Sequence, residues 1–411
     1  MRSRGGFETR PYNLPMNDLT YQNELLKCNR CGACKELCPT YLTTSNETMG
    51  ARGRVAMLGM LEEKQLAPSK RLSEKIFSCM LCGACRGLCP AGINIPEVIY
   101  HGRTRLKDLF SRGKLLSVAL RYSAARTDTV FSILRKMQKL FYRPLYKTGI
   151  MPYIPEITSE PFKNSFQVYK KFKRLSRVAI FSGCSVNYLY PDLGRALSRI
   201  LLSKGFEVIV FKGELCCGAP LRSAGMEDEA VSLAKRNIEH FSRVRAEAIL
   251  SMCPTCTMVI REHYPEILGN TISNFMDINE FFAKYEIAKD LEISPSVMTY
   301  HDPCHLNHGL KITNEPRQIL KGIRGVEFIE MRHPGDCCGF AGSFSLHFKD
   351  ISRNIAKNKI DSIVNTKADT VVTSCPGCIM QFESFRRELN TRIKIKHIVE
   401  VVDEAMRSAV E

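Results

Sequence analysis

Eighteen cysteines, grouped in short runs, are the residues of this 411-residue chain whose spacing points to chemistry. Eight of them form two copies of the pattern C-x2-C-x2-C-x3-C-P, at residues 28–39 and 79–90. Three thiolates in such a run can close around one face of an iron–sulfur cube. The glycine and alanine inside each run suit a backbone that wraps closely around a cluster. A zinc site or a disulfide framework fits less well, because zinc sites use two well-separated C-x2-C pairs.

The other ten cysteines fall into two groups of five with the same internal order: one cysteine, then Cys-Cys-Gly, then Cys-x-x-Cys. The first group contains Cys184, Cys216, Cys217, Cys253 and Cys256, and the second contains Cys304, Cys337, Cys338, Cys375 and Cys378. Corresponding cysteines lie 120, 121 and 122 residues apart along the chain. Such a constant spacing indicates an internal duplication.

The adjacent cysteines restrict the chemistry of each group of five. Neighbouring thiols rarely reach the torsion of a disulfide, whereas they can bridge two irons of one cluster. Five thiolates exceed the four that a cube or a zinc ion needs, which favours an unusual iron–sulfur site. Two alternatives stay open: a zinc site, and a thioredoxin-like interpretation in which the Cys-x-x-Cys pair has a lowered thiol pKa.

Short strands alternate with helices after residue 177, and these elements must position the cysteines. Strands are expected at 178–181, 206–211, 248–250, 297–300 and 370–373, and helices near 191–204 and 226–245. The cysteines follow the strand ends, and open α/β sheets hold their ligands outside the carboxyl ends of the strands. We therefore expect each group of five to converge at one end of a small parallel sheet.

Composition disfavours several classes of protein. The apolar content of 44% is ordinary for a globular protein. No run of 18 or more apolar residues is present, so no bilayer-spanning helix is expected, and residues 1–6 lead into no apolar segment of a signal peptide. Eighteen cysteines without an export signal indicate a reducing compartment and metal ligation rather than disulfides. No G-x-G-x-x-G follows a predicted strand, so neither flavin nor NAD is expected on this chain.

The net charge of +17 is concentrated in one segment, residues 101–177, which carry 18 Lys/Arg and 4 Asp/Glu. Residues 101–147 are expected to be helical, and 148–176 to form a proline-containing linker. Basic residues alternate with an apolar stripe in this helix: Arg121, Arg126, Arg135, Lys136, Lys139 and Arg143. The segment would dock on a partner subunit or an anionic membrane surface, or it is an ordinary connector helix. Nucleic-acid binding is disfavoured because no aromatic stacking platform or zinc-finger spacing accompanies the charge.

These motifs carry a resemblance to known families. The two four-cysteine runs resemble those of a bacterial two-cluster ferredoxin. Each group of five resembles the cysteine-rich CCG domain. Their combination is similar to the iron–sulfur subunit of glycolate oxidase and to the cysteine-rich subunits of anaerobic glycerol-3-phosphate dehydrogenase and of heterodisulfide reductase. The likeness covers roughly residues 20–405, and residues 38–41 with 50–54 look most like the glycolate oxidase branch.

The resemblance implies an α+β multidomain chain with a helical two-[4Fe-4S] ferredoxin module, a basic helical connector and two tandem α/β CCG domains. The expected units are a flexible arm at 1–19, the ferredoxin domain at 20–100, the connector and linker at 101–176, the first CCG domain at 177–290 and the second at 291–411.

The implied cofactors are two cubane [4Fe-4S] clusters and one or two further, noncubane [4Fe-4S] clusters. In two-cluster ferredoxins the fourth cysteine of each run ligates the other cluster. By that rule one cube takes Cys28, Cys31, Cys34 and Cys89, and the other takes Cys79, Cys82, Cys85 and Cys38. The two groups of five would hold the noncubane clusters.

The implied function is that of an electron-transfer subunit of an oxidoreductase complex, which relays electrons from an FAD-containing dehydrogenase of a glycolate- or lactate-type 2-hydroxy acid. The acceptor would be a quinone, a membrane cytochrome or another partner. The alternative is a heterodisulfide-reductase-like subunit that cleaves a disulfide at a CCG cluster. In that alternative the catalytic residues are Cys304, Cys337, Cys338, Cys375 and Cys378. We expect a cytoplasmic protein, or one peripheral to the inner face of the cell membrane.

Several polar residues near the cysteines could have either a functional or a structural role. His301, His305 and His308 would deliver protons or hydrogen-bond sulfur, or they are structural loop residues. Asp336 is expected to be a capping or solvated residue rather than a ligand. Of the residues between the ferredoxin runs, Arg52 and Arg54 would bond a cluster region or a carboxylate.

Overall fold

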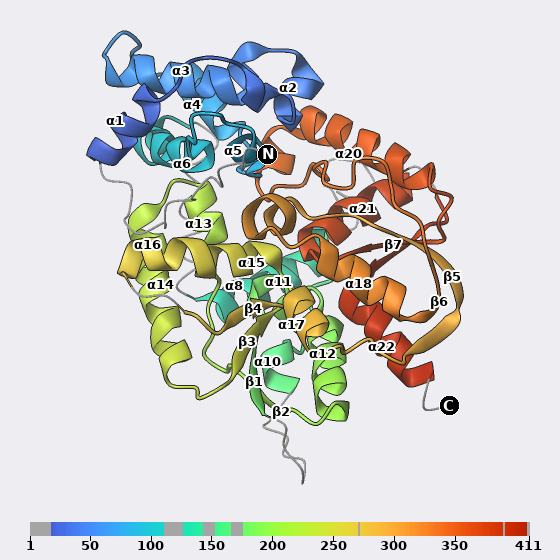
Figure 1. The fold of residues 1–411 in the computed structure, drawn as a ribbon. Coiled ribbons are helices and arrows are strands. Elements are labelled where there is room, and N and C mark those ends of the chain that lie inside the picture. The colour runs from blue at the N-terminus through green and yellow to red at the C-terminus, as the bar shows by residue number, and fades with distance from the viewer. Residues whose placement is uncertain are drawn as a thin grey trace, which may run out of the picture.

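The computed structural model describes residues 18–110, 126–142, 153–165, 176–269, 272–388 and 391–408. Figure 1 shows a helical N-terminal module, in blue, beside two α/β units coloured green to yellow and orange to red. Almost all of the predicted arm at 1–19 and large parts of the predicted connector at 101–176 lie outside the described residues.

The N-terminal module consists of short helices around a common apolar core. They are α1 (Asp18–Leu26), η1 (Ala33–Lys35), α2 (Pro39–Thr44), η2 (Glu47–Met49), α3 (Ala51–Glu62), α4 (Lys70–Phe77), α5 (Ala84–Gly87), α6 (Ile95–Leu106) and η3 (Lys107–Leu109). Proline in the first turn favours the start of α2 and α6, and the Ser69 hydroxyl accepts a bond from the Leu72 N–H at the start of α4. Leu58, Ile76 and Val98 are completely buried between these helices.

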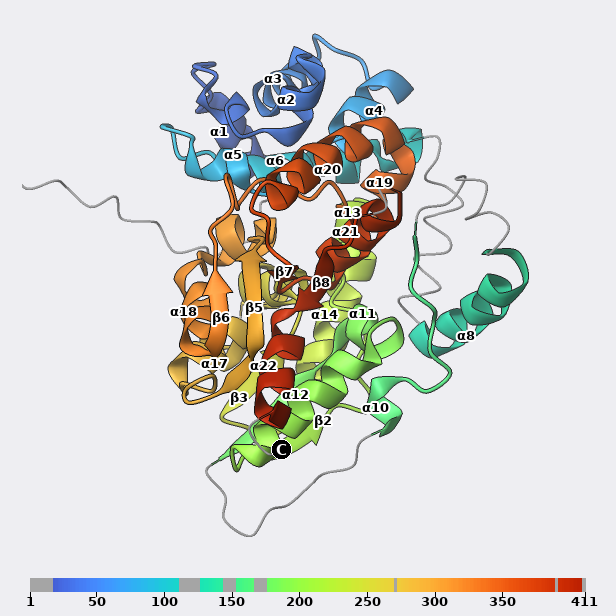
Figure 2. The same ribbon diagram turned by 90° about the vertical axis from the view of Figure 1, so that its right-hand side faces the viewer.

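The described part of the connector comprises α8 (Thr127–Met137), the π-helical turn η4 (Gln138–Tyr142) and α10 (Phe162–Ser165). Residues 101–147 were predicted to be helical, and the described residues of this segment lie in α6, η3, α8 and η4, apart from Phe110, which is extended, and Arg126. Figure 2 shows α8 at the side of the molecule. It is held at its start by Asp128, which bonds Lys163 at 2.7 Å and the Tyr188 hydroxyl at 2.5 Å.

Each α/β unit is built on a four-stranded parallel sheet, with strand orders β2-β1-β3-β4 and β6-β5-β7-β8. The strands are β1 (Arg177–Phe181), β2 (Glu207–Val210), β3 (Ala248–Ser251), β4 (Phe275–Asp277), β5 (Glu292–Tyr300), β6 (Arg324–Phe328), β7 (Thr370–Thr373) and β8 (Lys394–His397). The predicted parallel α/β units are therefore confirmed. The edge strands β4 and β8 were not predicted from the sequence.

Helices connect and cover these strands. The first unit has α11 (Gly183–Tyr188), α12 (Pro191–Ser203), α13 (Ala219–Ser223), α14 (Glu227–Ser242), α15 (Pro254–Met258), η5 (Val259–His263), α16 (Tyr264–Leu268) and α17 (Ile278–Lys284). The second has η6 (His305–Leu310), α18 (Asn314–Gly322), α19 (Phe344–His347), α20 (Lys349–Val364), α21 (Pro376–Glu388) and α22 (Ile398–Ser408).

The two units share one hydrophobic core rather than having separate ones. Phe281 of α17 and Tyr300 of β5 belong to the same buried cluster as Val402 of α22. At the rim of this interface, Arg199 pairs with Asp403 through two hydrogen bonds of 3.0 and 2.7 Å. The units are thus one folded body, because each covers apolar side chains of the other.

The N-terminal module is fixed to this body by buried cations. Arg222 of α13 bonds both oxygens of Glu97 of α6, at 3.1 and 2.9 Å, and both side chains are buried. Arg103 of the same helix α6 donates to the Ser223 carbonyl at 2.8 Å. A buried and fully hydrogen-bonded ion pair fixes relative orientation, because a lone buried charge is strongly destabilising.

His397 makes the structure sensitive to acid at the interface between the two units. It is completely buried, and its Nδ1 accepts a bond from the Val399 N–H, so its Nε2–H donates to the Met252 carbonyl at 3.0 Å. Burial lowers the pKa of His397 to about 4. The unfolded chain then binds the proton more tightly, so stability is present above pH 6.5 and is lost as the pH falls towards 4.

We predict that the contribution of His397 to the free energy of unfolding falls by about 2 kcal/mol between pH 6.5 and pH 5. Denaturant unfolding of wild type and His397→Gln, measured at both pH values, tests this. The variant should lose less stability on acidification than wild type. An equal loss in both proteins would assign the acid sensitivity to other groups.

Candidate metal centres

The eight cysteines of the N-terminal module line two separate cavities. One cavity is lined by Cys38, Cys79, Cys82 and Cys85, and the other by Cys28, Cys31, Cys34 and Cys89. The fourth cysteine of each run therefore lies with the first three of the other run, which is the crossed arrangement of two cubes. Gly32 and Gly83, with φ of 90° and 82°, let each run turn sharply around its cavity.

The buried side chain of Arg54 supports the loops of these runs. It donates to the Thr40 and Ser78 hydroxyls at 3.0 and 2.9 Å and to the Lys75 carbonyl at 2.9 Å. The sequence left open whether Arg54 bonds the cluster region or a carboxylate. In the structure it bonds the cluster region. Arg52 bonds the Glu47 carboxylate at 2.6 Å and also donates to the Arg30 carbonyl, inside the first ferredoxin run, at 3.2 Å. Arg54 thus helps to bring Cys38 and Cys79 together, because Thr40 follows Cys38 by two residues and Ser78 directly precedes Cys79.

Arg103 was not identified from the sequence, although it lies beside the same cavity. It donates to the carbonyls of Phe77 and Cys79, and burial lowers its pKa to about 10. A buried cation near thiolate ligands stabilises their negative charge. The only sequence signal for it was its place among the many basic residues after position 100.

The five thiols of the first α/β unit form a continuous series of contacts. Cys184 interacts with Cys216, Cys216 with Cys217, Cys217 with Cys256, and Cys256 with Cys253. The cysteines lie just beyond the carboxyl ends of β1, β2 and β3, and three of the five are buried. Neighbouring parallel strands end at the same sheet edge, so this convergence follows from the topology.

The second unit repeats this series in the same order. Cys304 interacts with Cys337, Cys337 with Cys338, Cys338 with Cys378, and Cys378 with Cys375. All five sequence-predicted residues of each group therefore lie together. That they ligate a cluster remains a prediction.

Contacts between the thiols lower the pKa of some cysteines and raise that of others, in the same pattern in both units. Hydrogen bonds from Cys216 and Cys256 lower the pKa of Cys217 to about 6, and bonds from Cys337 and Cys378 lower that of Cys338 to about 6. Contact with Cys216 and burial raise the pKa of Cys184. Metal ligation requires thiolates and releases their protons, so a buried set of converging thiols suits an iron–sulfur cluster. The five cysteines of each unit are thus a donor set that fits an iron–sulfur cluster.

The two groups of five and the ferredoxin runs meet at His305. Its Nδ1 contacts the Thr255 hydroxyl at 2.8 Å, within the first Cys-x-x-Cys, and its Nε2 contacts the Leu81 carbonyl at 3.3 Å, within the second ferredoxin run. Since a carbonyl only accepts, Nε2 carries the proton and the Thr255 hydroxyl donates to Nδ1. Burial lowers the pKa of His305 to about 4, so the ring is neutral. His305 is a structural bridge between three cysteine loops.

The centre of the second unit also packs directly on the ferredoxin module. Met80 and Cys82 share one hydrophobic cluster with Cys337 and Phe344, and Cys304 packs against it. The charges of Cys82 and Cys304 interact. The cavity lined by Cys38, Cys79, Cys82 and Cys85 is therefore adjacent to the second group of five.

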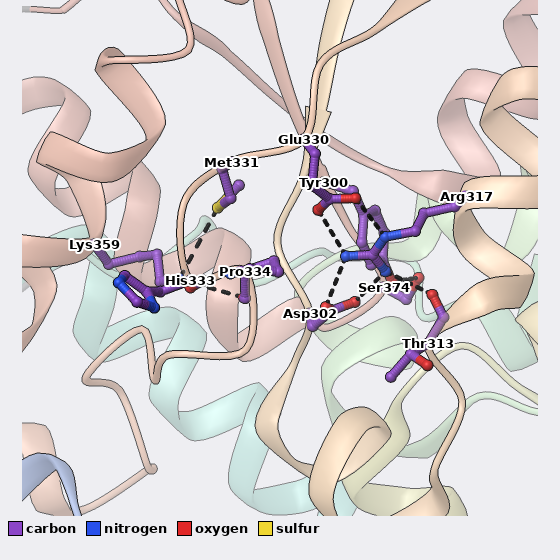
Figure 3. Close-up of polar contacts among 10 residues, drawn as sticks. All are labelled: Tyr300, Asp302, Thr313, Arg317, Glu330, Met331, His333, Pro334, Lys359 and Ser374. Carbon is purple, nitrogen blue, oxygen red and sulfur yellow. Dashed lines mark hydrogen bonds and ion pairs between the residues drawn. The ribbon is translucent and has the colours of Figure 1, made fainter. Parts of the chain in front are cut away.

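Two cationic side chains, Arg317 and Lys359, bond residues close to Cys304 in the chain or in the loop before Cys337, and Figure 3 shows both of them with their partners. Arg317 bonds both oxygens of Asp302 at 2.9 Å and both of Glu330 at 2.8 and 2.6 Å. On the other side, the buried Lys359 donates to the His333 carbonyl at 2.6 Å and the Pro334 carbonyl at 3.3 Å. Neither Arg317 nor Lys359 was identified from the sequence, because their partners are distant in the chain.

The other predicted polar residues differ in their surroundings. His301 is 1% exposed, and burial lowers its pKa to about 3, an effect that Asp302 and the Pro334 carbonyl oppose. Burial also lowers the pKa of His308. Asp336 is exposed. Proton delivery by His301, His305 or His308 remains a prediction.

Comparison with known families divides the chain in the same way. Residues 178–261 and 298–383 each match the cysteine-rich domain family, and residues 24–93 match the 4Fe-4S dicluster domain.

Similar proteins cover nearly the whole chain. One subunit of the fumarate reductase (CoM/CoB) of Methanothermobacter marburgensis is 30% identical, over 93% of this chain and 72% of that protein. The probable glycolate oxidase iron–sulfur subunit of Bacillus subtilis is 26% identical, over 93% and 94%. One subunit of the dihydromethanophenazine:CoB–CoM heterodisulfide reductase of Methanosarcina barkeri is also 26% identical, over 93% and 94%.

A crystal structure of a hypothetical protein from Helicobacter pylori shares the fold. It has a TM-score of 0.56 and 11% sequence identity, and the match covers 95% of this chain and 75% of that one.

Arg54 provides a test of the ferredoxin centre that lies next to the second α/β unit. Arg54→Met removes three buried hydrogen bonds to a charged group, and we expect it to lower the free energy of unfolding by about 3–5 kcal/mol. It should also release iron from the site lined by Cys38, Cys79, Cys82 and Cys85. Denaturant unfolding and iron analysis of anaerobically purified protein measure the two effects.

Arg324→Met is the control, because Arg324 of β6 pairs with Glu292 on the exposed surface of the second α/β unit and such pairs contribute about 1 kcal/mol or less. If both variants lost stability and iron equally, the buried network of Arg54 would not be what supports the site.

Proposed function

The chain belongs to the family of iron–sulfur oxidoreductase subunits that join a 4Fe-4S dicluster domain to two cysteine-rich CCG domains, and we propose that it relays electrons between a flavoprotein dehydrogenase and a separate acceptor. The dehydrogenase would oxidise a 2-hydroxy acid of the glycolate or lactate type. The acceptor would be a quinone or a membrane cytochrome. The names of similar proteins support a dehydrogenase of this type as the electron donor, since two of them are named as glycolate oxidase iron–sulfur subunits.

One observation carries this proposal: the cysteine centres are contiguous. Cys31 is exposed at one end of the ferredoxin module, and Cys82 packs against the second group of five at the other. His305 then joins this region to the first group through Thr255. Electron transfer between cofactors needs such adjacency, and isolated thiol or zinc sites would have no need of it.

The proposed ligands follow from the lining of the sites. Two cubane [4Fe-4S] clusters would be held by the two crossed sets of four cysteines, and noncubane [4Fe-4S] clusters by the two groups of five. When bound, such clusters supply reversible one-electron transfer. The protein's own contribution is to exclude water, to hold the sulfurs in place and to supply buried donors such as Arg54 and Arg103.

A second candidate function is disulfide reduction at the CCG centres. It is favoured by the complete set of five cysteines in both units, and by relatives named as heterodisulfide reductase and fumarate reductase (CoM/CoB) subunits. In this alternative Cys304, Cys337, Cys338, Cys375 and Cys378 would form the active site. The acceptor would then be a disulfide rather than a quinone.

The docking of partners is proposed at two surfaces. On the ferredoxin module, Leu37 and Leu42 are 40% and 60% exposed near Cys38, which suits a flavoprotein subunit. On the connector, Ile133, Leu134 and Met137 of α8 are 42–51% exposed among basic residues, which suits an anionic membrane surface. In the described part of the chain, no helix is long and apolar enough to cross a membrane.

Iron and sulfide analysis of anaerobically purified protein tests the cofactors. Four loaded centres predict about 16 irons per chain, four per cluster. EPR spectra with and without a disulfide substrate then separate the two functions, because only a reductase should show a disulfide-dependent signal. Cys337→Ser should remove a noncubane signal and leave both cubes. About 8 irons per chain would confine the clusters to the ferredoxin module and end the relay through the CCG domains.

Vesicle sedimentation tests the proposed membrane contact of α8. We expect the protein to bind vesicles containing anionic phospholipid at low salt, and binding to fall at least tenfold when Arg135, Lys136 and Lys139 are replaced by Gln, because about 1 kcal/mol is lost for each basic residue. The variant should keep its full iron content. Unchanged binding, or equal binding to neutral vesicles, would exclude α8 as a membrane-docking helix.

A further inference from the structure

The two CCG centres have the same sulfur framework but different buried neighbours. His301 stands three residues before Cys304, and the matching position before Cys184 is Phe181. Lys359 of α20 matches Asn237 of α14, since buried positions along both helices keep a spacing of 122 residues. The second centre thus has an imidazole and an ammonium where the first has a phenyl ring and a neutral amide.

His301 faces the sulfurs of the second centre. A ring nitrogen, the Cys338 sulfur and the Cys378 sulfur all lie within 4.8 Å of one another. The ring is buried and lies edge-on to the Phe382 ring, with 4.9 Å between the ring centroids. The Pro334 carbonyl is near enough to raise the pKa of His301, but neither ring nitrogen has a hydrogen-bond partner of good geometry within the described residues. A buried polar group without a hydrogen-bond partner is energetically costly. A hydrogen bond from the imidazole N–H of His301 to a cluster sulfur would remove this cost.

Lys359 adds a buried positive charge to the same centre. It is 2% exposed, and its charge interacts with both Cys337 and Cys338. The neighbouring Asp336 also interacts with Lys359, but it is exposed, so solvent screens its charge more strongly. A charge acts over a longer distance in the protein interior than in water.

The first centre has neutral groups at these places. Phe181 is fully buried and packs edge-on against the rings of Phe241 and Phe275. Asn237 bonds the Leu215 N–H, the Cys216 carbonyl and the Tyr264 hydroxyl. Lys163 of α10, which packs beside this unit and is also buried, pairs with Asp128 at 2.7 Å.

We propose that His301 and Lys359 make the C-terminal CCG centre the more easily reduced of the two. Reduction adds negative charge to a bound cluster, and hydrogen bonds to its sulfurs and nearby cations stabilise that charge. Electrons entering through the ferredoxin module would therefore collect at the centre that packs on Cys82. This inference rests on the proposed function, since it requires that both groups of five hold clusters.

EPR-monitored redox titration of the full-length holoprotein tests the inference, with one electron per centre supplied by the titrating reductant. Cys217→Ser disrupts the first CCG centre and Cys338→Ser disrupts the second, so in each variant the EPR signal of the other centre can be titrated alone. The midpoint potential of the C-terminal CCG centre should be higher than that of the first CCG centre by at least about 59 mV. For one electron, this difference corresponds to a tenfold change in the ratio of reduced to oxidised centre. His301→Phe and Lys359→Asn should each lower the C-terminal midpoint, and Lys359→Arg should retain it.

The duplication supplies the reciprocal variants. Phe181→His and Asn237→Lys place the polar groups in the first centre and should raise its midpoint. Lys357→Asn is the control, because Lys357 is exposed on the same helix as Lys359 and should leave both midpoints unchanged. If His301→Phe or Lys359→Asn loses iron, the reciprocal variants decide the question.

The outcomes separate this inference from the proposed function. Equal midpoints in a protein with about 16 irons would overturn the inference and leave the relay intact. Midpoints that differ but do not respond to the variants would also overturn it. About 8 irons would overturn both, because the CCG centres would then hold no clusters.

Discussion

The structure depends on holding ten thiols in two tight groups inside the protein. Contact with a neighbouring thiol and burial raise the pKa values of Cys184 and Cys304, so keeping several thiolates together costs free energy, which a bound metal would offset. The parallel sheets bring the thiols of each group together. Three neighbouring strands in each unit end at one edge, and each strand end delivers one part of the motif.

The two units need each other to complete these edges. The His397 ring, at the end of β8, bonds the Met252 carbonyl directly before Cys253. In the opposite direction, the Ser374 hydroxyl directly before Cys375 bonds Asn279, which follows β4. The edge strands β4 and β8 therefore support the Cys-x-x-Cys of the other unit as well as their own sheets. An isolated unit would lose these buried hydrogen bonds.

Cysteine spacing predicted the crossed grouping in the ferredoxin module and the convergence of each group of five, because both follow from local motifs and from strand order. The sequence did not predict the interactions that join the modules. Arg222 with Glu97, and Lys359 with the His333 carbonyl, connect residues far apart in the chain, and no local pattern marks them. The extended residue Phe110, which follows η3 inside the segment expected to be helical, was also not predicted.

Duplication explains why the differences between the centres lie outside the cysteines. The sulfur positions are fixed by the sheets, so a change there would disrupt both the fold and the site. The neighbouring loop positions are freer to vary. Asp302 accepts hydrogen bonds from Arg317, which also bonds Glu330, whereas the counterpart of Asp302, Ser182, donates to the buried Glu214. Burial raises the pKa of Glu214 to about 8, so this carboxyl adds little charge at neutral pH. One loop is thus fixed by charges and the other by a neutral pair, which leaves two identical sulfur frameworks in unequal electrostatic surroundings.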